Sequence, residues 1–237
     1  MKIRFAALAA ALTVALTLPA LAGAQEAAIR KNLTTRLPNL GQIDEVNKTP
    51  MPGLYEVRMG TNIIYTDAEA NFILEGNLLD TQARKNLTEE RVSKLTAIDF
   101  GSLPAQNAFT IVRGDGSRKL AVFEDPNCGY CKRFEKELQK VDNVTVQLFL
   151  IPILGPDSVV KARQIWCSAD KGKVWQDWMV RGVPLEGNPI CNTDALTANV
   201  EFAKKYRITG TPTLVFADNT RVPGAIDAQQ VEQHLMK

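Results

Sequence analysis

The stretch that decides the fold is LAVFEDPNCGYC, residues 120–131. Its continuous apolar start predicts a buried strand, Asp-Pro-Asn predicts a turn, and the two cysteines open a predicted helix. The unpaired N–H groups and partial positive charge of a helix N-terminus stabilise a thiolate. Cys128 falls at the expected helix start, so we expect it to be the nucleophile. Cys131, one turn inside, is the expected resolving thiol, the one that displaces Cys128 from a mixed disulfide. Gly129 and Tyr130 are expected to support the pair.

The first 24 residues have the pattern of a secretory signal peptide, with a basic start, a long apolar run and an Ala-Gly-Ala end. We expect cleavage after Ala24, so that Gln25 begins a mature, exported protein. An uncleaved membrane anchor is the alternative, because the apolar run is nearly long enough to cross a bilayer. Pro19 and the small residues at the end favour cleavage.

The charge of the chain is nearly balanced. It has 28 Lys and Arg residues against 26 Asp and Glu, a net charge of +2, and the two signs are interleaved. No basic stripe indicates a nucleic-acid partner. The hydrophobic fraction of 45% is ordinary for a globular protein.

Two further cysteines, Cys167 and Cys191, stand alone in the sequence. Because disulfides persist in exported proteins, we expect a structural disulfide between them, with free buried thiols as the alternative. A zinc site usually takes four ligands in close pairs, and His234 is the only histidine, so we expect no metal and no cofactor. Three tryptophans are expected to pack around the disulfide: Trp166, Trp175 and Trp178.

Residues 25–85 form a predicted small α+β module without cysteine or histidine, and nothing in it looks catalytic. Glycines and a polar segment separate its β-rich runs. The expected elements are a helix at 27–37 and strands at 54–59, 61–65 and 72–76.

Residues 86–104 are expected to form a linker helix. Asn86 or Thr88 can cap its start, and two glutamates suit its first turn. The helix can act as a spacer between two modules or pack on either of them.

Residues 105–237 form the second predicted module. Two strands, 109–113 and 119–124, are expected to pair as a hairpin across Gly-Asp-Gly. The order of the remaining elements is that of a thioredoxin fold with a helical insertion. We therefore expect an α+β module, a linker helix and an α/β thioredoxin-like domain. The later elements are the cysteine helix, a central strand at 144–151, a mostly helical stretch at 159–205, strands at 214–216 and 221–222, and a helix from Asp227.

Thr211-Pro212 stands just before a predicted strand. In a thioredoxin fold a cis-proline at this place faces the cysteines, so Thr211 is expected to border Cys128. Proline also removes a donor and leaves the backbone of Thr211 for an extended substrate. An ordinary trans-proline turn is the alternative, because most X–Pro bonds are trans.

Charged residues flank the cysteines on both sides. Glu124 or Asp125 is a candidate to relay protons for Cys131, since buried carboxyl groups are poised for that role, and the alternative is a turn acid that bonds local N–H groups. Lys132 and Arg133 can favour the thiolate or simply face solvent.

Together these motifs resemble the DsbC/DsbG family of periplasmic thiol:disulfide interchange proteins. The resemblance covers the whole mature chain. In the first module it rests on PGL at 52–54, IYTD at 64–67 and ILEG at 73–76. In the second it rests on Cys-Gly-Tyr-Cys and Thr-Pro, and the separate pair of structural cysteines also matches the family.

The resemblance implies a periplasmic disulfide isomerase and reductase that rearranges mispaired disulfides and also holds unfolded chains. It implies a homodimer joined through the N-terminal modules. The implied partners are misfolded or mis-oxidised exported proteins and a DsbD-type membrane reductase. Three alternatives remain open: a DsbG-like reductase of sulfenic acids, a periplasmic chaperone whose cysteine pair is incidental, and a membrane-tethered thioredoxin that serves one partner, such as cytochrome maturation.

Overall fold

The computed structural model describes residues 18–187 and 190–236, and the chain divides after Val92 into two compact units. Most of the expected signal peptide lies outside the described residues. The division falls inside the expected linker, and the boundaries 25–85, 86–104 and 105–237 stay predictions. No helix in the described ranges is both long and apolar enough to cross a membrane.

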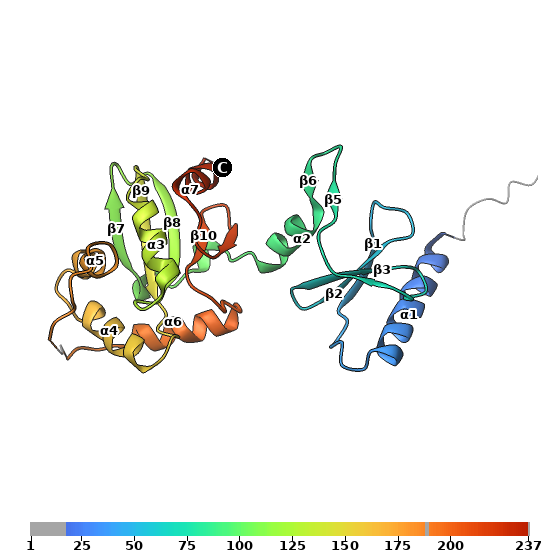
Figure 1. Cartoon of the computed structure of the whole chain (residues 1–237), viewed down its shortest axis with the longest axis horizontal. Helices are drawn as coiled ribbons and strands as arrows, with labels where there is room; N and C mark the ends of the chain where they lie inside the picture. The colour runs from blue at the N-terminus through green and yellow to red at the C-terminus, as the bar shows by residue number, and fades with distance from the viewer. Residues whose placement is uncertain (1–17, 188–189, 237) are drawn as a thin grey trace, which may run out of the picture. The chain divides into compact units, whose positions relative to one another are not determined.

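The N-terminal unit is an antiparallel sheet covered by one helix (Figure 1). Ile29 and Leu33 of the helix pack on Tyr55, Val57 and Ile64 of the sheet. In sheet order the strands are β1 (Glu45–Lys48), β2 (Tyr55–Met59), β3 (Asn62–Thr66) and β4 (Ile73–Leu74). The covering helix is α1 (Leu18–Arg36), and a separate hairpin joins β5 (Leu79–Asp80) to β6 (Lys85–Asn86).

The expected strands of the first module correspond to β2, β3 and β4. Neither β1 nor the β5–β6 hairpin was predicted, because β1 reads Glu-Val-Asn-Lys with one apolar residue and the hairpin strands have two residues each. The helix begins at Leu18, earlier than expected, and runs through the expected cleavage position after Ala24.

Helix α2 (Leu87–Thr96) begins against the N-terminal unit. The Asn86 side chain accepts a hydrogen bond from the Glu89 N–H at 3.1 Å, which is an N-cap contact. Thr88 is buried instead, and its hydroxyl lies 2.5 Å from the Tyr65 hydroxyl. Arg91 pairs with Glu56 at 3.1 Å. Of the two residues considered for the cap, Asn86 takes that position.

The C-terminal unit has a five-stranded sheet with the order β11-β10-β8-β9-β7, in which only β8 and β9 are parallel (Figure 1). This is the thioredoxin fold that was expected. Short 3₁₀ turns at Phe100–Ser102 and Ala105–Asn107 precede it. The strands are β7 (Phe109–Arg113), β8 (Arg118–Glu124), β9 (Val144–Leu150), β10 (Thr213–Phe216) and β11 (Arg221–Pro223).

The prediction that residues 109–113 and 119–124 pair as a hairpin was wrong, because the turn at residues 114–116 does not join two paired strands. Strand β9 lies between β7 and β8, so each pairs with β9 and not with the other. The loop passes over the start of β9, where the Asp115 N–H donates to Asn143 at 3.1 Å. Thr145 donates to the Gly116 carbonyl at 2.7 Å. A turn motif is a local signal, so it could not indicate that a strand from later in the chain, the apolar β9, lies between β7 and β8.

Helices cover both faces of this sheet. On β8, Leu120 and Val122 face α3 (Gly129–Leu138) and α7 (Ala228–Leu235), whereas Ala121 and Phe123 face α6 (Asp194–Lys205). The helical insertion was expected, and it packs beside the cysteines. It comprises α4 (Pro156–Trp166), α5 (Lys171–Gln176), a π-helical turn at Asp177–Arg181, and α6.

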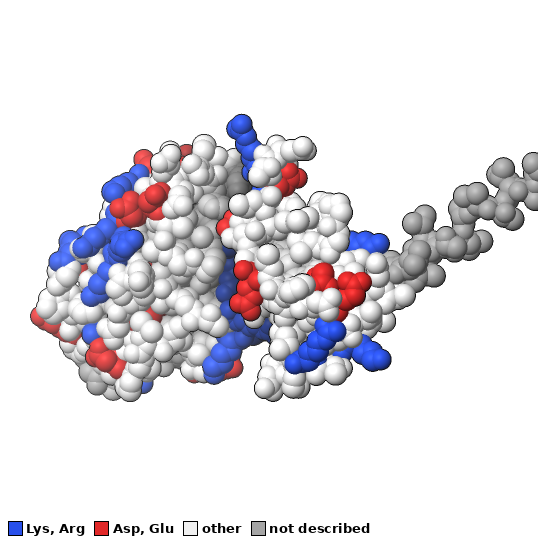
Figure 2. Space-filling model, turned by 45° about the vertical axis from the view of Figure 1, so that its right-hand side comes forward, with Lys and Arg blue, Asp and Glu red and all other residues white. Residues whose placement is uncertain are grey.

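Charged residues are dispersed on the surface seen in Figure 2. Small groups of both signs stand between broad uncharged areas. This distribution agrees with the near balance of charge in the sequence.

Candidate active site

Cys128 is the N-cap residue of α3. Its Sγ accepts a hydrogen bond from the Cys131 N–H at 3.3 Å. Cys128 is 5% exposed and Cys131 is fully buried, while Tyr130 between them is 66% exposed. The first thiol therefore lies at the surface end of the helix and the second lies in the core.

The two thiols differ in proton affinity. A hydrogen bond with the Cys131 side chain, helped by Thr211 and by backbone N–H groups, lowers the pKa of Cys128 to about 5, against the opposing effect of partial burial. Burial raises the pKa of Cys131, and so do its bond to Cys128 and the nearby carboxyl of Glu124. At neutral pH, which lies above the pKa of Cys128, the Cys128 thiol is ionised whereas the Cys131 thiol keeps its proton. The site holds one thiolate and one thiol.

Thr211 faces Cys128 across the site. Thr213 of β10 pairs with Phe123 of β8, so the segment before β10 lies beside the loop that carries the cysteines. The Thr211–Pro212 peptide bond is cis. The Cys128 thiol lies 3.2 Å from the Thr211 carbonyl oxygen, to which it donates when protonated.

The acids before the cysteines have different surroundings. Asp125 is fully buried and holds the loop segments around the site together. It is thus a turn acid of the kind considered from the sequence. Its carboxylate accepts hydrogen bonds of 2.7–2.9 Å from the N–H groups of Asn127, Ile153 and Leu154 and from the Ser158 hydroxyl.

Glu124 is the acid that reaches the Cys131 thiol. It ends β8 on the face that carries Leu120 and Val122, so its side chain points toward α3. It is fully buried and interacts with the Cys131 thiol. Burial and the neighbouring carboxyl of Glu135 raise the pKa of Glu124 well above its ordinary value.

Glu135 was missed in the sequence. It stands one turn after Cys131 on the apolar face of α3, fully buried, and accepts a hydrogen bond from Trp175 Nε1 at 2.7 Å. Its position was a usable signal, because Cys131, Phe134 and Leu138 mark that face at helical spacing. A charged residue on an otherwise apolar face needs a partner inside the protein.

Two of the three tryptophans that were expected to pack around the disulfide lie near Cys128 and Cys131 instead. Trp175 shares the core cluster of Cys128 and Cys131. Trp178 donates to the Pro126 carbonyl at 2.6 Å, and the Lys132 ammonium lies 4.0 Å from the centre of its ring. Lys132 is therefore partly buried against Trp178, whereas Arg133 is exposed.

The second cysteine pair is joined in a disulfide. The Cα atoms of Cys167 and Cys191 are 5.6 Å apart, and the bridge spans 24 residues that include α5. Trp166, beside it, donates to the Asn192 carbonyl at 3.1 Å. Closing a loop of this size contributes roughly 3–4 kcal/mol in the chain-entropy model. The alternative left open by the sequence, that Cys167 and Cys191 are free thiols, is therefore wrong.

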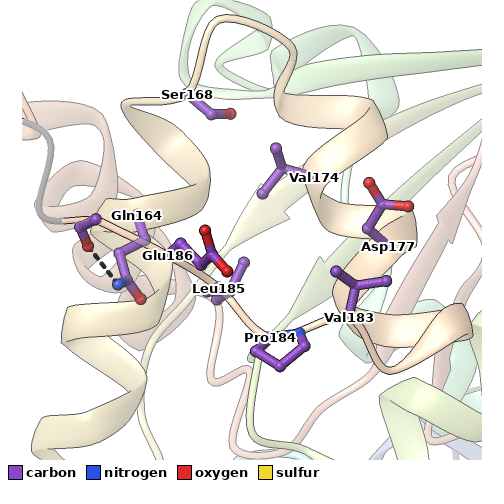
Figure 3. Close-up of a pocket in the computed structure, with 9 residues that line it drawn as sticks. Gln164, Ser168, Val174, Asp177, Val183, Pro184, Leu185 and Glu186 are labelled. Carbon is purple, nitrogen blue, oxygen red and sulfur yellow. Dashed lines mark hydrogen bonds between the residues drawn. The ribbon is translucent and has the colours of Figure 1, made fainter.

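A pocket of about 680 Å³ opens within the helical insertion, between α4, α5 and residues 183–187 (Figure 3). Val174, Val183, Pro184 and Leu185 make much of its wall apolar, and Gln164 closes one side by donating to the Gly187 carbonyl at 2.6 Å. None of its lining residues belongs to the cysteine motif. Across the described residues, no three His, Cys, Asp or Glu side chains are grouped to hold a metal.

A thiolate at a helix N-terminus, a buried thiol behind it and a cis-proline segment across from it define a class, the thiol:disulfide oxidoreductases of the thioredoxin fold. Comparison with known proteins identifies the family within this class. Residues 105–237 match the thioredoxin-like domain family, and residues 20–89 match the N-terminal domain of disulfide bond isomerase proteins.

Relatives named as thiol:disulfide interchange proteins match most of this chain. A "probable thiol:disulfide interchange protein DsbC" of Bordetella parapertussis is 42% identical over 212 residues, which cover 89% of this chain and 74% of the relative. The DsbC protein of Escherichia coli K12 is 25% identical over 90% of this chain and 89% of its own. A disulfide interchange protein of Neisseria gonorrhoeae, 38% identical, superposes with a TM-score of 0.54 over 56% of this chain and 96% of its own.

The chain belongs to the DsbC family of thiol:disulfide interchange proteins. It is an enzyme of thiol–disulfide exchange with disulfide isomerase function, which agrees with the fold and the function expected from the sequence.

Proposed function

We propose that this protein rearranges mispaired disulfides of exported proteins through Cys128 and Cys131. The observation that carries the proposal is the division between the two thiols: one is ionised at the helix N-terminus and the other is buried with its proton. A thiolate is the reacting species in disulfide exchange, and the protonated partner waits without competing for the substrate.

The proposed reaction begins when the Cys128 thiolate attacks one sulfur of a substrate disulfide. That S–S bond breaks, a mixed disulfide with Cys128 forms, and the other substrate sulfur leaves as a thiolate. In isomerisation another substrate thiolate then attacks the mixed disulfide and regenerates the Cys128 thiolate. In reduction Cys131 attacks Cys128 instead, which releases reduced substrate and oxidises the enzyme pair.

Glu124 has a role only on the reductive branch. Cys131 must lose its proton before it attacks, and the Glu124 carboxyl is the titratable side chain beside it at the end of β8. A buried acid with raised pKa is suited to take that proton near neutral pH. Isomerisation needs no such transfer, because Cys131 stays protonated.

Substrate is proposed to lie between Tyr130 and Thr211. Tyr130 is the exposed aromatic side chain at the nucleophile, and Leu154, on the loop held by Asp125, is also exposed. An extended chain can pair with the backbone of Thr211, since Pro212 supplies no donor of its own. These contacts have little sequence preference, as an enzyme acting on many misfolded chains requires.

The N-terminal unit is proposed to join two copies into a homodimer. Phe72 is 77% exposed, and Leu74 on the edge strand β4 and Leu79 on β5 are exposed as well. Exposed apolar side chains at a sheet edge favour pairing with another chain. The paired arrangement would also support holding of unfolded chains.

The proposal places the protein in the periplasm after removal of residues 1–24, with a DsbD-type membrane reductase keeping the cysteines reduced. It is supported by the signal-peptide pattern and by the family. N-terminal sequencing of the exported protein should begin at Gln25.

The test is recovery of activity from scrambled ribonuclease. Wild type and Cys131→Ala should restore it when a small thiol keeps them reduced, whereas Cys128→Ala should be inactive yet still suppress aggregation of an unfolded protein. Isomerisation by Cys128→Ala would contradict the proposed function.

A further inference from the structure

Two carboxyl groups face each other behind the resolving thiol. Glu124 ends β8, and Glu135 lies one turn beyond Cys131 on α3. Both side chains are fully buried and interact directly with each other. The reaction proposed above uses only Glu124, so the second acid has no assigned role.

The surroundings of the pair are unequal. Glu135 Oε1 accepts the hydrogen bond from Trp175, and Arg113 on β7 attracts the same carboxyl. The influences that act most strongly on Glu124 are its burial, the other acid and the thiols of Cys131 and Cys128. The Asp142 carboxyl also acts on the Arg113 guanidinium. A negative charge is therefore better accommodated on Glu135 than on Glu124.

The hydrogen-bond count of the pair requires a proton. Both oxygens of Glu124 and Oε2 of Glu135 are buried, and no donor of the described residues bonds to any of the three. Two adjacent buried carboxylates cannot both be ionised at low energetic cost. One proton on Glu124, donated to Glu135 Oε2, satisfies two of the three oxygens and leaves one free to face Cys131.

We propose that Glu124 and Glu135 hold one proton between them and act as a single proton acceptor for Cys131, with Glu135 as a positioning residue. This inference rests on the proposed function of the reductive branch. The Cys131 proton moves to the pair, the new sulfur–sulfur bond to Cys128 forms, and the mixed disulfide breaks. The substrate sulfur leaves as a thiolate, so the enzyme dithiol is oxidised and the substrate disulfide reduced. The pair, now carrying two protons, returns one to solvent.

The kinetic test uses a mixed disulfide between Cys128 and glutathione, prepared in the full mature chain. Release of glutathione is followed against pH in a single turnover. Glu124→Gln should slow release by about 100-fold, the lower range for loss of a general base. Glu135→Gln should move the midpoint of the pH profile down by about one unit, because Glu124 loses its negative neighbour. Glu137→Gln, on the same helix, bonded to Lys140 and facing away from the cysteines, is the matched control and should follow wild type.

A second measurement does not depend on the variants folding well. In the reduced wild type, ¹³C NMR titration should show the carboxyl carbons of Glu124 and Glu135 responding in the same two steps, as coupled groups do. Independent single steps, or a Glu135→Gln profile that superimposes on wild type, would overturn the inference. A wild type that releases no glutathione would instead contradict the proposed function itself.

Discussion

The sulfur of Cys128 lies 3.2 Å from the backbone carbonyl oxygen of Thr211, although 83 residues separate them along the chain. The register between β10 and β8 brings the two together. The Thr211 side chain also contributes to the low pKa of Cys128. The reactivity of the cysteine therefore depends on strand pairing as well as on its own helix.

Removing the Thr211 hydroxyl should weaken the thiolate. Thr211→Val keeps the shape and the carbonyl but loses a donor to a charged sulfur, an interaction of about 1.5–3 kcal/mol. The pKa of Cys128 should rise by about one unit or more, measured from thiolate absorbance in the reduced protein.

Thr213→Val is the matched control for this change. Its buried hydroxyl donates to the Gly210 carbonyl at 2.8 Å and not to sulfur. It should cost stability and leave the cysteine titration unchanged. If both variants shift the titration equally, Thr211 has no specific effect on the thiolate.

The stability of the reduced protein should depend on the charge of Cys128. Its pKa in the folded state is about 5, below the value of roughly 8.5 in an unfolded chain. Between these two pH values the folded state therefore binds fewer protons than the unfolded state. Ionisation of Cys128 then increases the free energy of unfolding as the pH rises from 5 to 8.5, and this contribution is lost as the pH falls through 5.

Urea unfolding of reduced wild type and of Cys128→Ala isolates this contribution, because the other titrating groups are common to both. The difference in unfolding free energy should rise with pH across the interval. A difference that stays flat, or that falls with pH, would show that the thiolate is not stabilised by folding.

Local sequence determined the parts of the site that are contiguous. An apolar run, a Pro turn and a cysteine at an N-cap lie within twelve residues, so the strand, the loop and the start of α3 were predictable. The cluster around Cys131 was not predictable in this way, because the contacts of Glu135 are made with Trp175 and Glu124, which lie on other elements. The wrong hairpin has the same cause, since the insertion of β9 between its neighbours is a long-range event.

Asp125 should be a major determinant of stability next to the site. Asp125→Ala leaves three N–H groups and the Ser158 hydroxyl without their acceptor, at an expected cost of about 3 kcal/mol. Asp157→Ala is the control, because this exposed carboxylate bonds Asn127 and Lys161 at the surface. It should cost under about 1 kcal/mol in the same denaturant titration. Equal effects of the two substitutions would contradict the role given to Asp125.

The proposed dimer makes the exposed apolar residues of the N-terminal unit sensitive to charge. Phe72→Glu combined with Leu74→Glu should raise the dimer dissociation constant at least ~10-fold, measured by sedimentation, because each buried charge costs more than 1 kcal/mol. Val112→Glu, at an exposed apolar position on β7 of the other unit, should leave the dimer unchanged. A wild type that sediments as a monomer would remove the dimer from the account.

The central claim is that Cys128 is the reactive thiolate and Cys131 the shielded thiol. The most direct measurement is brief alkylation of the reduced mature protein with iodoacetamide at about pH 6, above the pKa of Cys128, followed by peptide mapping. The account predicts one modified residue, Cys128, with Cys131 unlabelled until the protein is unfolded. Labelling of Cys131 in the folded protein, or no labelling of Cys128 until the pH approaches 8.5, would contradict it.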